Sequence, residues 1–92
     1  MIRGFRHKGL KRLHETGTTQ GIQPAHERKL KRILATLDAA ATPNELDLPG
    51  YGLHLLKGRM KGHWSTTVNG NWRVTFTFTG ADVDQVDYLD YH

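Results

Sequence analysis

The stretch Trp64–Thr79, WSTTVNGNWRVTFTFT, decides the fold. Large apolar side chains alternate with small or polar ones on both sides of 69–71, and this twofold period predicts two strands joined by a hairpin. A two-residue loop would divide the large side chains between the two faces, and a one-residue shift turns every side chain over. We therefore predict a three-residue loop over 69–71, which pairs Val68 with Trp72, Thr66 with Val74 and Trp64 with Phe76.

This register also predicts what the opposite face carries. Arg73, Thr75 and Thr77 would lie there, open to solvent. Arg73 is the only basic residue after Lys61. Its guanidinium could bind a phosphate through two hydrogen bonds, or it could form an ion pair with one of the C-terminal aspartates.

Two helices are predicted before the hairpin. Leu10 and Leu13 lie three apart and Gly17 follows, which indicates a short helix and its stop. A second helix is predicted to start near Pro24 and to end at Thr42-Pro43-Asn44. Its buried stripe follows the helical period and comprises Leu30, Ile33, Leu34, Leu37 and Ala41.

The remaining segments complete an α+β fold. A short first strand is predicted from Ile2, Phe5 and Arg6, another strand within 53–56, and a last strand over about 83–91. We expect two helices packed on one face of a twisted, mainly antiparallel sheet, all within a single domain over 1–92.

Composition excludes several classes of protein. No apolar run approaches the roughly 20 residues of a membrane span, and the first residues lack the apolar core of a signal peptide. We therefore expect a cytoplasmic protein with no membrane partner. The chain has no cysteine, so a disulfide framework, a thiol nucleophile and a cysteine zinc site are excluded.

The net charge of +4 hides a gradient along the chain. Residues 1–63 hold twelve basic and five acidic residues, whereas residues 64–92 hold Arg73 against four aspartates. A basic region of this kind is typical of a protein that binds a phosphate-rich partner. A basic surface that is merely solvated is the other reading of the same pattern.

Six histidines raise the question of a metal site or of acid–base chemistry. No pair has the i, i+4 spacing of a helical zinc site beside a glutamate, so we expect no metal and no cofactor. His54, between Leu53 and Leu55, could be a general acid or base, or a half-buried structural histidine. His92 ends the chain, where its own carboxylate favours a protonated imidazole.

Five segments, spread over nearly the whole chain, carry a family resemblance: FRHKGL (5–10), LHLLKG (53–58), GHWS (62–65), VNGNWRVTF (68–76) and DYLDYH (87–92). In this order and spacing they resemble the HigB-type toxins of the RelE/ParE superfamily, which are the killer proteins of bacterial type II toxin–antitoxin systems. One departure is Leu89, where relatives often carry an acidic residue.

The resemblance implies a RelE-like microbial RNase fold and a ribosome-dependent mRNA endoribonuclease. Such an enzyme cuts mRNA in the ribosomal A site by metal-independent attack of a 2′-hydroxyl, and a HigA-type helix-turn-helix antitoxin is the implied partner. The match places four residues at catalytic positions, with Lys57 and Asp90 beside them as supporting candidates. The four are His54, Arg73, Tyr91 and His92.

The residue chemistry is compatible with this implied activity. Cleavage needs a base for the 2′ proton, an acid for the 5′ oxygen and positive charge near the phosphorane. His54 and His92 could act in either order, Arg73 and Lys57 could stabilise the phosphate, and Tyr91 could orient it or stack on a base. Ribosomal RNA would then be held by the basic residues Lys8, Lys11, Arg12, Arg28, Lys29, Lys31 and Arg32.

Two other functions remain open. A ParE-like inhibitor of DNA gyrase would share the fold and the basic helices but would not need the four catalytic candidates together. A non-catalytic RNA-binding module would need exposed aromatics on its sheet. The predicted register instead turns Trp72, Phe76 and Phe78 toward the core, away from Arg73.

Overall fold

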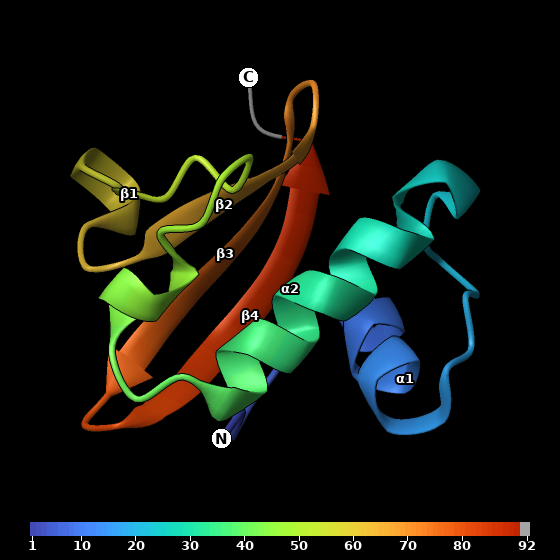
Figure 1. Ribbon diagram of the computed structural model, residues 1–92, viewed down its shortest axis with the longest axis horizontal. Helices are drawn as coiled ribbons and strands as arrows, with labels where there is room; N and C mark the ends of the chain where they lie inside the picture. The colour runs from blue at the N-terminus through green and yellow to red at the C-terminus, as the bar shows by residue number, and fades with distance from the viewer. Residues whose placement is uncertain (91–92) are drawn as a thin grey trace.

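The computed structural model describes residues 1–90 (Figure 1). It has two α-helices, α1 (Lys8–Thr16) and α2 (Glu27–Ala39), followed by a four-stranded sheet. The strands are β1 (His54–Leu55), β2 (Trp64–Asn69), β3 (Trp72–Thr79) and β4 (Asp82–Asp90). Short 3₁₀ turns occupy Pro24–His26, Pro43–Leu46 and Gly58–Met60. No helix within these 90 residues is long and apolar enough to span a membrane.

The sheet is a meander with both helices on one of its faces. Its strands are antiparallel neighbours in the order β1-β2-β3-β4. α2 crosses in front of the sheet, while α1 lies beside α2 and β4 (Figure 1). The α+β prediction is therefore confirmed, and we call the face turned away from the helices the outer face.

The predicted first strand is wrong. Ile2 and Phe5 form only isolated parallel bridges, to Val83 and Val86 of β4. Between these two bridges β4 contains a β-bulge, where the register against β3 shifts. The bulge interrupts the ladder, so the N-terminal segment is attached to β4 at two points and forms no continuous strand.

The register of the central hairpin is confirmed, but its loop is not. Trp64 lies opposite Phe76 and Thr66 opposite Val74, as predicted. Asn69, however, pairs with Trp72, so only residues 70 and 71 form the turn, and Val68 is the extra residue of a bulge. The bulge has the effect that we expected from a third loop residue. It restores the alternation, so the large side chains still share the core face.

The core joins one stripe of α2 to the inner face of the sheet. Leu30, Ile33, Leu34 and Leu37 are buried as predicted, but Ala41 is exposed. The helix ends at Ala39, because the Glu45 carboxylate accepts the backbone N–H groups of Ala41 and Thr42. Ala40 takes the buried place instead. The partners across the core include Leu10, Leu13, Val74, Phe76, Val83 and Val86.

The ends of the helices are set by local residues. Gly17 stops α1 with a positive φ of 78°, as predicted. Pro24 begins a 3₁₀ turn that leads into α2, so the α-helix proper starts at Glu27. At the other end of α1, the Nδ1 atom of His7 accepts the backbone N–H of Leu10 at 3.1 Å. His7 is therefore the N-cap of α1.

The outer face is less open than predicted. Arg73 and Thr77 are partly exposed, but Thr75 is fully buried and Ser65 is 1% exposed. The backbone N–H of Leu56 donates to the His63 carbonyl, which continues the β1–β2 pairing. Alternation then turns Leu56 and His63 to the outer face, in the row next to Ser65 and Thr75.

The bulge in β4 generates a stability prediction. Gln85 has a φ of 51° and an exposed side chain, so it occupies the left-handed region with no packing to compensate. Gln85→Gly should raise the free energy of unfolding by about 0.5–1 kcal/mol, and Gln85→Val should lower it. Urea denaturation of the three proteins measures this. Equal or lower stability of the glycine variant would contradict a strained Gln85.

Candidate functional site

Strand register places two catalytic candidates on the outer face. His54 lies opposite Ser65, Ser65 opposite Thr75, and Thr75 opposite Asp87, which forms one row across the sheet. The next row contains Thr67, Arg73 and Leu89. From strand spacing and rise, the Cα atoms of His54 and Arg73 are roughly 12 Å apart. Two long side chains at that separation can reach one bound nucleotide from both sides.

His54 is an exposed side chain on the two-residue edge strand β1. Its Nδ1 lies 3.4 Å from the Gly52 carbonyl oxygen, a long contact at the limit of hydrogen bonding. The half-buried structural alternative is therefore wrong for this histidine. Its ring is accessible for proton transfer. Lys57 follows His54 by three residues in the chain. It is also exposed and adds positive charge to this segment.

Arg73 is held by the hairpin. Its Nη1 atom donates to the carbonyl oxygens of Gly70 at 2.6 Å and of Trp72 at 3.0 Å. Both acceptors are neutral, so these bonds orient the guanidinium without cancelling its charge. The Gly70 carbonyl is available because the two-residue turn holds Gly70 at a φ of 55°. The turn that joins β2 to β3 therefore also positions the predicted phosphate ligand.

The other C-terminal candidates are placed differently. Asp90 lies opposite Trp72, whose side chain packs toward the helices, so the sheet separates Asp90 from Arg73. A supporting role for Asp90 in catalysis thus stays a prediction. Tyr91 and His92 lie outside the described residues, and their catalytic roles also stay predictions.

The seven basic candidates for RNA contact divide into two groups. Six are exposed: Lys8, Lys11, Arg12, Arg28, Lys31 and Arg32. Lys31 also pairs with Glu27 at 2.7 Å. Lys29 is the seventh, and its ammonium donates to the Gly50 carbonyl at 2.6 Å and lies 5.7 Å from the centre of the Tyr51 ring. Burial, then the neighbouring Arg32, lowers the Lys29 pKa. Lys29 therefore fastens the 47–51 loop to α2.

Sequence reasoning missed an aromatic cluster on the helix side of the sheet. Trp72 and Tyr88 stack at a centroid distance of 4.7 Å, and the rings of His7 and His26 meet Tyr88 edge-on. The Tyr88 hydroxyl is 2.6 Å from Nδ1 of the buried His26. Burial raises the pKa of Tyr88, and a hydrogen bond from the Gln23 backbone opposes that rise. No local pattern in the sequence links residues 7, 26, 72 and 88.

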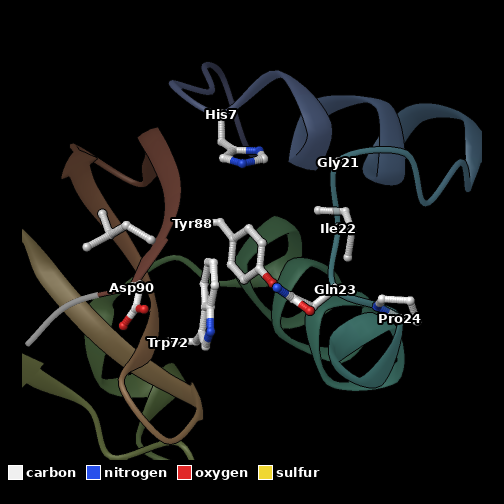
Figure 2. A pocket seen from close by; sticks show the side chains of 9 residues that line it. His7, Gly21, Ile22, Gln23, Pro24, Trp72, Tyr88 and Asp90 are labelled. Carbon is white, nitrogen blue, oxygen red and sulfur yellow. The ribbon is translucent and has the colours of Figure 1, made fainter.

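A pocket of about 470 Å³ opens beside this cluster (Figure 2). It lies between the end of β4, the N-cap of α1 and the loop that leads into α2. Its lining comprises His7, Gly21, Ile22, Gln23, Pro24, Trp72, Tyr88, Leu89 and Asp90. Within residues 1–90, no group of three or more His, Asp or Glu side chains could hold a metal ion.

Comparison with known proteins decides the family. Residues 3–92 match the family model described as the RelE-like toxin of the type II toxin-antitoxin system HigB. The chain belongs to the HigB-like toxins. Endoribonuclease HigB of Proteus vulgaris is 44% identical over 92 residues, and the match covers 100% of both proteins.

Solved structures agree with the fold of this HigB-like toxin. The YoeB–YefM complex from Staphylococcus aureus matches with a TM-score of 0.64 and 17% identity, over 100% of this chain and 98% of the other. A YafQ variant from E. coli matches with a TM-score of 0.58 and 21% identity, over 95% and 89%. At these identities the likeness concerns the fold alone. The RelE-like, α+β expectation is confirmed.

His7 generates a prediction on pH. Burial is the main cause that lowers its pKa below 6.5, with Arg12 adding to the decrease and Asp87 opposing it. The folded protein therefore binds fewer protons than the unfolded chain just below pH 6.5, and the stability contributed by neutral His7 is lost as the pH falls through that region. Melting temperatures from pH 8 to pH 5 should fall less in His7→Asn than in the wild type.

Asparagine suits this test because its side-chain oxygen can still cap α1. The remaining five histidines are common to both proteins, so their contribution cancels in the comparison. An equal fall in the melting temperatures of the two proteins between pH 8 and pH 5 would contradict the prediction. It would show that the pKa of His7 is the same in the folded and unfolded chains.

Proposed function

We propose that this toxin is a ribosome-dependent mRNA endoribonuclease that cuts mRNA in the ribosomal A site and so inhibits translation in the bacterial cytoplasm. The observation that carries the proposal is the shared outer face of His54 and Arg73, where the hairpin orients the guanidinium. The activity named for the 44% identical relative, an endoribonuclease, supports it.

The proposed reaction uses the RNA itself as nucleophile. The 2′ oxygen forms a bond to the adjacent phosphorus, the bond from phosphorus to the 5′ oxygen breaks, and a 2′,3′-cyclic phosphate and a 5′-hydroxyl result. One imidazole, of His54 or His92, takes the 2′ proton, and the other gives a proton to the leaving oxygen. Arg73, with Lys57, stabilises the negative charge of the phosphorane, and Tyr91 orients the phosphate. No metal takes part in this scheme.

The ribosome and the antitoxin are proposed as the two partners. The exposed cations of α1 and α2 would contact the phosphates of ribosomal RNA, and such contacts weaken as salt concentration rises. Membership of a type II toxin family supports an antitoxin partner, and one structural neighbour, YoeB, was solved in complex with YefM. We propose a HigA-type helix-turn-helix protein as the antitoxin of this toxin.

Loss of Arg73 tests the site. Arg73→Ala should reduce the rate of ribosome-dependent mRNA cleavage by roughly 10²–10³-fold, the usual cost of removing one group that stabilises the transition state. Its fold should remain, because the side chain is partly exposed and, within residues 1–90, its hydrogen bonds go to the neighbouring turn. Cleavage is followed by primer extension on programmed ribosomes, with circular dichroism to check folding.

Arg3→Ala is the matched control, because Arg3 is exposed and lies 3.7 Å from Asp82 at the opposite end of β4. It removes the same charge and should cleave at the wild-type rate. Wild-type cleavage by Arg73→Ala would place the site elsewhere. Cleavage of free mRNA would support the RNase chemistry but show that the ribosome is not required for it. Growth arrest without any cleavage would favour a ParE-like inhibitor of gyrase.

A C-terminal extension tests the terminal histidine. A short neutral peptide added after His92 removes the free carboxylate from that residue, which raises the fraction of neutral imidazole. We expect a strong loss of cleavage, of about tenfold or more. The same peptide added before Met1 is the control. Equal rates for both extended proteins would exclude the terminal His92 from the mechanism.

A further inference from the structure

The loop between β1 and β2 is rich in positive charge. Its residues 57–62, which we call the basic loop, read KGRMKG. Lys57, Arg59 and Lys61 are exposed, whereas Met60 is half-buried. In the part of the chain that the structure describes, the ion pairs involve none of these three cations. Lys57 belongs to the proposed site, but Arg59 and Lys61 have no role in the cleavage chemistry.

Backbone hydrogen bonds give the basic loop a defined shape. At its base, the Leu56 N–H donates to the His63 carbonyl at 2.8 Å. Within it, the Lys61 N–H donates to the Gly58 carbonyl at 3.1 Å, and the His63 N–H donates to the Met60 carbonyl at 2.9 Å. A loop whose backbone is already ordered loses less entropy when its side chains bind a ligand.

The basic loop continues the outer face of the sheet beyond His54. His63, at the base of the loop, and Arg73 both turn to this face, with the row of His54 between them. Thr67 lies opposite Arg73, and His63 precedes Thr67 by four extended residues, so the base of the loop is roughly 13 Å from the row of Arg73. An extended chain bound at Arg73 and His54 would therefore reach the basic loop next.

Charge divides the sheet into a positive and a negative side. Residues 48–81, which include β1, β2 and β3, contain no aspartate or glutamate. The four aspartates that follow all lie on β4: Asp82, Asp84, Asp87 and Asp90. β1 and β4 are the opposite edges of the sheet (Figure 1). A polyanion on the outer face is therefore repelled by the β4 edge and attracted to the edge with the basic loop.

The surface between Arg73 and the basic loop suits a nucleic-acid backbone better than a base. The outward side chains of β2 and β3 on this path are small hydroxyl residues: Ser65, Thr67, Thr75 and Thr77. The tryptophans and phenylalanines of the same two strands pack with the core on the other face. These strands thus offer no ring on which a base could stack, and an RNA strand here would be held by its phosphates.

We propose that the basic loop binds the phosphodiester backbone of the mRNA where it leaves the cleaved phosphate, with Arg59 and Lys61 as phosphate ligands. Cations that neutralise phosphates release counterions, which gives affinity without reading the base sequence. The loop would hold the substrate strand, while the reacting atoms are left to His54 and Arg73. The proposal rests on the proposed function, which supplies mRNA as the substrate.

The salt dependence of RNA binding tests the basic loop. The probe is a labelled oligouridine of about 12 nucleotides with 2′-O-methyl riboses, which have no 2′-hydroxyl to attack the phosphate. For a single strand, the logarithm of the affinity falls with the logarithm of the salt concentration by about 0.7 per phosphate contact. Arg59→Gln/Lys61→Gln should reduce this slope by about 1.4 and weaken binding at about 0.1 M salt by roughly 10–30-fold. Fluorescence anisotropy measures both quantities.

Arg3→Gln/Arg6→Gln is the matched control. Both arginines are exposed and belong to the N-terminal segment that bridges to β4. This variant removes the same charge as the loop variant and should leave the salt slope unchanged. An oligoadenosine of the same length should show the same loss in the loop variant, because phosphate contacts carry no sequence information. Circular dichroism checks the folding of both variants.

An unchanged slope in the loop variant, or an equal decrease in the control variant, would overturn the proposal. Ribosomes without mRNA distinguish the two sources of phosphate. The loop variant should bind them as the wild type does, and weaker binding would overturn the assignment to mRNA and indicate ribosomal RNA. Failure of the proposed function is separate, because it would appear as a wild-type protein that shows the expected salt slope but cleaves no mRNA on ribosomes.

Discussion

The structure depends on the alternation of β3. Val74 and Phe76 are fully buried against the helices, and that burial leaves Arg73 to the other face. A shift of one residue would expose the apolar side chains and bury a guanidinium, at a cost of several kcal/mol. The bulge at Val68 therefore matters, because it lets a tight two-residue turn coexist with this alternation. The same turn supplies the Gly70 carbonyl that orients Arg73.

A second constraint joins the helices to the end of β4. The bond between His26 and Tyr88 spans 62 residues of sequence and is buried. Replacing Tyr88 by phenylalanine would take this partner from Nδ1 of the buried His26, which costs about 1–3 kcal/mol. With the Trp72–Tyr88 stack, this bond fixes where β4 ends relative to Arg73. A packing contact on the helix side thus sets the geometry of the outer face.

Local patterns predicted the parts of the fold that local physics decides. The stripe of α2, the stop at Gly17 and the core register of the hairpin all follow from periodicity or from one backbone conformation. The errors have two sources. A local pattern was overlooked at the end of α2, where Glu45 bonds the backbone of Ala41 and Thr42. Contacts between residues far apart in the sequence caused the others: the N-terminal segment meets the bulge in β4, and Lys29 bonds the Gly50 carbonyl. The placement of Asp90 likewise needed the register between β3 and β4, which periodicity within one strand does not contain.

The positive charge of this toxin lies on two separate surfaces, which implies two separate tasks. The exposed cations of α1 and α2 lie in the helix layer, whereas Arg73 belongs to the outer face of the sheet. One folded RNA segment cannot neutralise both without wrapping the molecule. Docking on ribosomal RNA and stabilisation of the cleaved phosphate therefore draw on different residues. Salt should then weaken docking through many exposed contacts, while the Arg73 contact with a desolvated phosphate is screened much less.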